Sequence, residues 1–167
     1  PESLYNVLVA FRDKDPNGNG IADEIPLIGT AGNLSGDAIS WIINMFLYAD
    51  NSTYFNVDKD GKLYSPYRED AYREALKYIR KLYKEGLLSP LTLTATPQDI
   101  RQMVCPAENG VQLAGIAVTH LTVGFVEGHE GILNYSPVPM WGNVITEDNQ
   151  NYYSTFITRD CSNVDAA

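Results

Sequence analysis

The sequence predicts an α/β fold in which helices cover both faces of a sheet. Segments with apolar residues at helical spacing alternate with short apolar runs that end in turn residues, an order typical of this class. Residues 111–118 form the clearest strand, because an almost continuous apolar run is the pattern of a strand covered on both faces. We expect a single α/β domain over residues 1–167, a length that can bury a core.

The first helix is expected to begin at a cap on Ser3 and to end near Asp13. Its apolar residues recur at helical spacing: Leu4, Val7, Leu8 and Phe11. The short apolar run 25–28 then predicts a strand, which the Gly-, Thr-, Asn- and Ser-containing region 29–36 should end.

A second helix should begin near Ser35 or Asp37. Its apolar face would consist of Ile39, Ile42, Ile43, Phe46 and Leu47. Residues 54–57 and 62–64 flank Asp58-Lys59-Asp60-Gly61, whose Asp-Gly pair favours a hairpin turn. We interpret the two acids as turn residues rather than as a second metal site.

The longest helix is expected to begin at Ser65-Pro66 and to stop at Gly86. Its inward face would be formed by Tyr72, Leu76, Ile79 and Tyr83. The segment Thr96-Pro97-Gln98-Asp99 marks another helix start, with Ile100, Met103 and Val104 turned inward. Two further strand candidates cover residues 135–140 and 153–158.

The composition is that of a soluble globule, with 44% hydrophobic and 20% charged residues. A net charge of −9 disfavours nucleic acid and anionic membranes as partners, because both require basic residues to neutralise phosphates. Cys105 and Cys161 match neither a redox pair nor a zinc site, and their pairing stays open. The chain has no apparent signal segment, and we expect it to be truncated at both ends.

Residues 13–24 read as a calcium loop, because oxygen-bearing side chains alternate along them and two glycines allow a tight bend. Two registers fit. In the EF-hand register the ligands are Asp13, Asp15, Asn17, the Asn19 carbonyl and Glu24. In a register shifted by two, which we favour, the ligands are Asp15, Asn17, Asn19, the Ile21 carbonyl, Asp23 and Glu24.

The stretch DPNGNGIADEIP, followed by an apolar strand, resembles the calcium loop of extracellular solute-binding protein family 1, the maltose-binding-protein-like carbohydrate-binding lipoproteins of ABC transporters. That family's loop uses the shifted ligands. Weaker similarity lies in the Asp-Gly hairpin and in residues 71–76, 82–87 and 156–161. The resemblance extends over nearly all of this chain but only the middle of such a protein. It implies one lobe of a periplasmic-binding-protein type II fold, with a mixed sheet flanked by helices.

The resemblance implies the substrate-binding component of an ABC importer, which binds a sugar or oligosaccharide between two lobes and delivers it to permease subunits. Such a protein is not an enzyme. It works outside the cell, as a cell-surface lipoprotein or in the periplasm, and its calcium ion is structural. An alternative stays open, namely a calcium-stabilised, non-catalytic carbohydrate-binding or adhesion module of a secreted glycan-degrading protein.

The same resemblance nominates ligand-binding residues at the carboxyl ends of strands, where open α/β sheets bind ligands. Asp37 would accept a sugar hydroxyl and Trp41 would stack on a sugar ring, while Thr119 and His120 would form hydrogen bonds. Trp41 lies beside the apolar face of its helix, so a role in the core is equally open. Trp141 could lie in the cleft, near the hinge or in a loop. The calcium loop precedes its strand, so it should lie at the opposite end.

Overall fold

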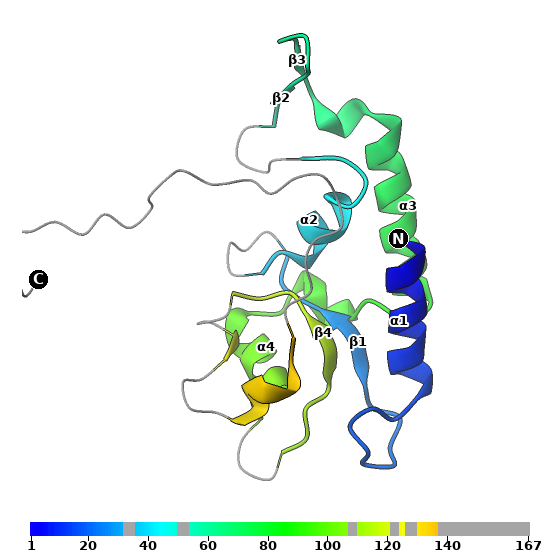
Figure 1. The fold of residues 1–167 in the computed structure, drawn as a ribbon, viewed down its shortest axis with the longest axis vertical. Coiled ribbons are helices and arrows are strands. Elements are labelled where there is room, and N and C mark those ends of the chain that lie inside the picture. Colours follow the sequence, from blue (N-terminus) through cyan, green and yellow to red (C-terminus); the bar gives the residue numbers. More distant parts are fainter. Residues whose placement is uncertain (32–35, 50–53, 107–109, 121–123, 126–129, 137–167) are drawn as a thin grey trace, which may run out of the picture.

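The centre of the fold is a pair of parallel strands. The structure is a computed structural model, and it describes residues 1–31, 36–49, 54–106, 110–120, 124–125 and 130–136. Strand β1 (Ile25–Ile28) pairs with β4 (Ala114–Ala117), with Leu27 opposite Ile116. A separate antiparallel hairpin joins β2 (Asn56–Val57) to β3 (Leu63–Tyr64). Parallel strands flanked by helices confirm the predicted α/β class (Figure 1).

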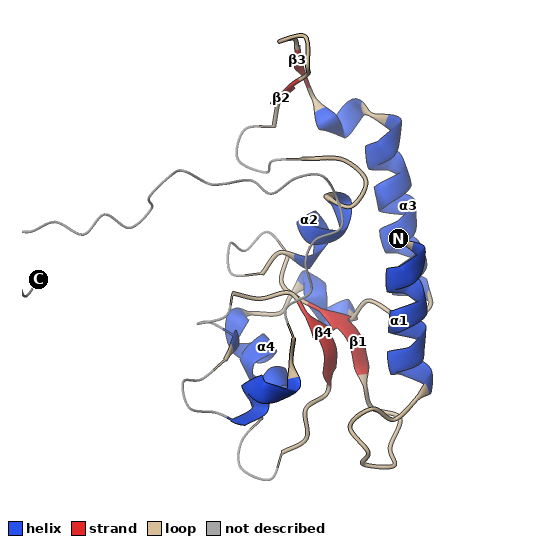
Figure 2. Ribbon diagram, in the orientation of Figure 1, coloured by secondary structure: helices blue, strands red, loops and turns tan. Residues whose placement is uncertain are grey.

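Helices cover both faces of the parallel pair, as Figure 2 shows for α1 (Glu2–Asp13) and α4 (Pro97–Val104). On the α1 side, α2 (Ala38–Ile43) and α3 (Asp70–Lys84) complete one core. Its buried residues are Leu4, Leu8, Leu27, Ile42, Leu82, Leu87 and Leu88. The core on the α4 side contains Ile28, Ile100, Val104, Cys105 and Ala114. Neighbouring residues of β1 thus enter opposite cores, as the pleat of a strand requires.

Short 3-10 helices connect the larger elements. They are η1 (Pro66–Arg68), η2 (Pro90–Leu93) and η3 (Glu130–Asn134). A capping box begins α4, because the Thr96 side chain accepts from the Asp99 amide while the Asp99 carboxylate accepts from the Thr96 amide. This cap confirms the helix start predicted from Thr96-Pro97. Within the described residues, no helix is long and apolar enough to cross a membrane.

Two predicted helix starts are wrong. Ser3 lies inside the first turn of α1, whose N-cap is Pro1 without a side-chain hydrogen bond. Pro66 begins η1 rather than the long helix, and α3 follows only after its N-cap, Glu69. The extended backbone of Glu69, with ψ of 145°, separates the two helices. The predicted end is confirmed, because α3 ends at Lys84 and Gly86 has a positive φ of 70°.

The buried face of α3 differs from the predicted one. Leu76 and Tyr83 are each 46% exposed, whereas Ala75 and Leu82 are fully buried. Helical spacing is compatible with two faces of α3: residues 72, 75, 79 and 82, or residues 72, 76, 79 and 83. Spacing alone therefore does not decide which face is buried. The small Ala75 side chain packs in the cluster that holds Ile43 of α2. Helix α3 is therefore rotated so that Ala75 faces α2.

The predicted strands are mostly longer than the observed ones. Strand β1 has the predicted bounds, but β4 covers only Ala114–Ala117 of the run 111–118. The Asp-Gly turn is confirmed, since the Asp58 carboxylate accepts from the amides of Asp60 and Lys62 and Gly61 has φ of 78°. Residues 135–136 are not in a strand. Residues 137–140 and 153–158, and also Cys161, lie outside the described residues, while Cys105 is a buried free thiol.

Candidate functional site

The carboxyl ends of β1 and β4 meet at two glycines. A Cβ atom on Gly29 would lie 2.6 Å from Cβ of Ala38 and 3.1 Å from Cβ of Val118. A Cβ atom on Gly36 would overlap the Val118 carbonyl oxygen and lie 2.8 Å from Cα of Thr119. Two segments far apart in the sequence therefore touch through backbone at this end of the sheet.

Hydrogen bonds close the segment that follows β1. The Thr30 amide and hydroxyl both donate to the Gly36 carbonyl, at 2.7 and 3.1 Å. The Ala38 amide donates to the Thr30 carbonyl at 3.0 Å. The Asp37 carboxylate accepts from the Ser40 amide at 2.9 Å and from the Ser40 hydroxyl at 2.7 Å, so Asp37 caps α2. This arrangement fixes the start of α2 beside the end of β4.

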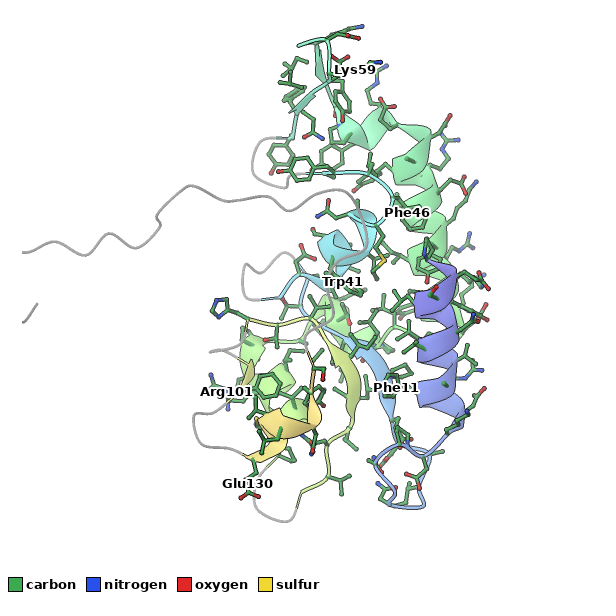
Figure 3. All side chains as sticks on the ribbon, viewed as in Figure 1. Phe11, Trp41, Phe46, Lys59, Arg101 and Glu130 are labelled. Atoms are coloured by element: carbon green, nitrogen blue, oxygen red, sulfur yellow. The ribbon has the colours of Figure 1, made fainter. Side chains whose placement is uncertain are left out.

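A cavity of about 430 Å³ lies along β4 next to this junction. Its described lining residues are Trp41, Gly115, Ile116, Ala117, Val118, Thr119, Phe125, Ile132, Tyr135 and Ser136. Trp41 extends from α2, as Figure 3 shows. Most of the lining is apolar or aromatic, with a few hydroxyl groups. Such a lining suits non-covalent binding of a ligand that has both an apolar face and polar groups.

Tyr135 is held firmly in the cavity wall. Its hydroxyl donates to the Ala114 carbonyl at 2.6 Å, and its ring lies edge-on to Phe125 with 5.4 Å between the ring centroids. Burial raises the pKa of Tyr135 to about 12. The phenol therefore stays neutral throughout the physiological range and acts as a hydrogen-bonding and packing group.

The nominated ligand residues are only partly brought together. Trp41 and Thr119 line the cavity, and Trp41 also packs against the core on the α1 side. Asp37 and the exposed His120 belong to the same end of the sheet but are not among the lining residues. Trp141 lies outside the described residues.

Sequence reasoning missed the wall formed by Phe125, Ile132, Tyr135 and Ser136. The sequence pattern predicts Tyr135 at the start of a strand, and no periodic pattern marks the short helix η3. The only usable signal is that Phe125 and Tyr135 are aromatic residues that follow the buried run 111–118.

The predicted calcium loop lies at the amino end of β1 (Figure 1), and none of its residues is among the described cavity-lining residues. Asp15 accepts from the amides of Asn19 and Gly20, at 3.1 and 2.7 Å. The Asn19 side chain accepts from the Ile21 amide at 2.7 Å and donates to the Asp23 carboxylate at 3.2 Å. Backbone amides of the loop thus hold the side-chain oxygens of Asp15 and Asn19.

Two details bear on whether an ion fits this loop. Glu24 Oε1 is buried and has no hydrogen-bond partner, a costly state for a carboxylate oxygen without a cation. Asp13 instead pairs with Arg12 at 2.7 Å, which lowers the pKa of the Asp13 carboxyl. Oxygen donors from Asp, Asn and Glu suit Ca²⁺. Within the described part of the chain, no three His, Cys, Asp or Glu side chains come together as a metal cluster, so the structure does not gather Asp15, Asp23 and Glu24 around one point.

Sequence comparison relates the chain to transporter proteins. No family profile matches it. It is 40% identical over 87 residues to the fructooligosaccharide ABC transporter substrate-binding protein FusA of Streptococcus pneumoniae serotype 4 (strain ATCC BAA-334 / TIGR4). It is 34% identical over 93 residues to lipoprotein LipO of Bacillus subtilis (strain 168). These matches cover 52% and 53% of this chain but only 16% and 18% of the two relatives.

Solved structures lead to the same group. FusA of S. pneumoniae in complex with kestose has a TM-score of 0.57 at 32% identity, covering 68% of this chain and 22% of FusA. An EF-hand mutant of FusA in complex with fructo-nystose has a TM-score of 0.59 at 31% identity and the same coverage. An HMO-binding solute-binding protein associated with an ABC transporter of Bifidobacterium longum infantis ATCC 15697 has a TM-score of 0.54 at 30% identity, covering 68% and 24%.

The motifs predicted a resemblance over nearly the whole chain, but the matches cover a smaller part of it. They also cover only about a quarter or less of the length of each relative. The matched part agrees in fold with solute-binding proteins, as a lobe of that fold would. By sequence and by fold, the chain is homologous to a segment of the substrate-binding proteins of ABC transporters.

Proposed function

We propose that this chain forms part of the sugar-binding lobe of an ABC importer's substrate-binding protein, and that its ligand is an oligosaccharide. The observation that carries this proposal is the cavity beside the carboxyl ends of β1 and β4, which has Trp41 and Thr119 in its wall. A sugar presents an apolar C–H face to an aromatic ring and hydroxyls to polar groups. Homology to FusA supports an oligosaccharide rather than another solute class.

The remaining features follow from this proposal. The protein binds its ligand without catalysis and delivers it to membrane permease subunits. It acts outside the cell, as the homology to lipoprotein LipO suggests. FusA and the Bifidobacterium protein are solute-binding proteins of ABC transporters, which favours this reading over a module of a glycan-degrading enzyme. Asp37, His120 and Trp141 stay candidates for ligand contacts that the cavity wall does not include.

Trp41→Ala is expected to weaken kestose binding by roughly 10- to 100-fold, because the stacking plane and its buried area are both lost. Trp41→Phe keeps a ring and should lose much less. Isothermal titration of the longest natural chain that contains this sequence would measure both variants, with thermal melts to check folding. Affinity for kestose that is unchanged in Trp41→Ala would remove Trp41 from the site. Wild-type protein that binds no member of an oligosaccharide panel that includes kestose would contradict the proposed function.

We also propose that the loop binds Ca²⁺ in the shifted register, through Asp15, Asn17, Asn19, the Ile21 carbonyl, Asp23 and Glu24. The orphaned Glu24 oxygen supports a cation in either register, and the engagement of Asp13 by Arg12 supports the shifted one. The ion would hold α1 and β1 together at the end opposite the cavity. The EF-hand mutant of FusA in complex with fructo-nystose is a relevant comparison.

Calcium at about 100 times its dissociation constant should stabilise the protein by about 2.7 kcal/mol, because it binds only the folded loop. A chain of this size should then melt roughly 5–10 °C higher than in EDTA. Asp23→Asn should abolish this shift, while Asp13→Asn, the matched control, should retain it. A shift that is lost in Asp13→Asn and kept in Asp23→Asn would support the EF-hand register instead.

A further inference from the structure

Gln112 joins four segments of the fold through hydrogen bonds. Its backbone carbonyl accepts from Asn17 Nδ2 in the loop at 3.3 Å. Its side-chain Nε2 donates to the carbonyls of Val104 and Gly131, at 2.7 and 3.0 Å, and its Oε1 accepts from Asn134 Nδ2 at 2.7 Å. Both Nε2 hydrogens and the Oε1 atom are therefore engaged, between the end of α4, the start of β4 and η3.

The contact with Gln112 sets the direction of the Asn17 side chain. A carbonyl can accept only from the Asn17 nitrogen, so Asn17 Oδ1 must point the other way. There it accepts from the Asn19 amide at 3.0 Å, inside the loop. Both contacts agree on the same orientation. Asn17 thus directs its oxygen toward the backbone of the loop and its nitrogen toward Gln112.

The other contacts of Gln112 reach the cavity. Gly131 is buried in η3, and the next residue, Ile132, lines the cavity. Tyr135 follows η3 and is held by the Ala114 carbonyl on β4. The segment 130–135 is therefore attached to the start of β4 at two points, Gln112 and Ala114. A shift of Gln112 would move the cavity wall.

We propose that Gln112 is a positioning residue that couples ion binding in the loop to the order of the cavity wall at residues 130–135. This inference rests on the proposed calcium loop. The ion fixes Asn17, Asn17 fixes the backbone of Gln112, and the Gln112 side chain holds η3 in place. By reciprocity, a ligand that orders this wall also tightens ion binding. The calcium ion then acts on the cavity as well as on the junction of α1 with β1.

Hydrogen exchange with calcium and with EDTA tests the coupling, in the longest natural chain that contains this sequence. In the wild type, calcium should slow amide exchange at residues 130–135 by about 3- to 10-fold, the effect expected of one net hydrogen bond. In Gln112→Ala, calcium should still bind and still slow exchange in residues 15–24, but the effect at 130–135 should disappear. Gln102→Ala, an exposed glutamine on α4, is the matched control and should behave as the wild type.

A second variant tests the coupling independently if Gln112→Ala does not fold. Asn134→Ala removes one of the three side-chain contacts of Gln112 and should reduce the calcium effect at residues 130–135 without abolishing it. Calcium that binds the wild type without slowing exchange at 130–135, or that slows it equally in Gln112→Ala, would overturn the coupling and leave the calcium loop intact. A wild type that binds no calcium, measured by titration, would overturn both.

Discussion

Gly36→Ala is expected to destabilise the protein by about 3 kcal/mol or more and to disrupt the cavity. Gly36 has φ of 154°, a backbone conformation that residues with a side chain rarely adopt. The Cβ atom that alanine adds would overlap the Val118 carbonyl. The overlap is with backbone, so no side-chain rotation relieves it. Urea unfolding followed by circular dichroism would measure the loss. Tryptophan fluorescence, measured in a Trp141→Phe background, would report on Trp41 and the cavity beside it.

Gly61→Ala is the control for this substitution. Gly61 also has a positive φ, 78°, but no atom lies within 4 Å of the added Cβ. It should cost about 1 kcal/mol from backbone strain alone and leave Trp41 fluorescence unchanged. Equal losses of stability in the two variants would mean that Gly36 does not pack against Val118.

Leu82→Ala should lower the free energy of unfolding by about 2–5 kcal/mol, because it leaves a cavity where α3 contacts the core on the α1 side. Leu82 is fully buried, in one cluster with Leu8 and Leu27. The same denaturation experiment would measure the change. The loss should appear with little change in the slope of unfolding free energy against urea.

Leu76→Ala tests the rotation of the same helix. Leu76 is 46% exposed, so its truncation should cost less than about 1 kcal/mol. The two substitutions remove the same atoms from α3 and differ only in the face they affect. If Leu76→Ala costs more than Leu82→Ala, α3 packs with the face that helical spacing first suggested.

Local chemistry made several elements predictable from the sequence. The apolar run 25–28 gave the bounds of β1, and the Thr96 and Asp99 side chains marked the start of α4. The Asp58–Gly61 turn followed from the need for a positive φ at Gly61. Each of these features depends on residues within a few positions of one another.

The features that could not be predicted from the sequence depend on contacts between residues far apart in the chain. The rotation of α3 follows from the fit of Ala75 against α2, which no periodicity reveals. The approach of Gly36 to Val118 joins residues that are 82 positions apart in the printed sequence. The cavity wall from η3 likewise depends on Gln112 and Ala114 of another segment. Trp41 and Thr119 could be nominated because they follow predicted strands and match a family's cleft positions, while Phe125 and Tyr135 had no comparable signal.

The proposed sugar site lies beside the carboxyl ends of β1 and β4. The most direct test is to map amide chemical-shift changes in the longest natural chain during titration with kestose. The largest changes should occur at residues 36–41 and 116–120, with small changes in the loop 15–24. Saturable changes centred on the loop, or on the hairpin 56–64, with none at residues 36–41 and 116–120, would contradict it.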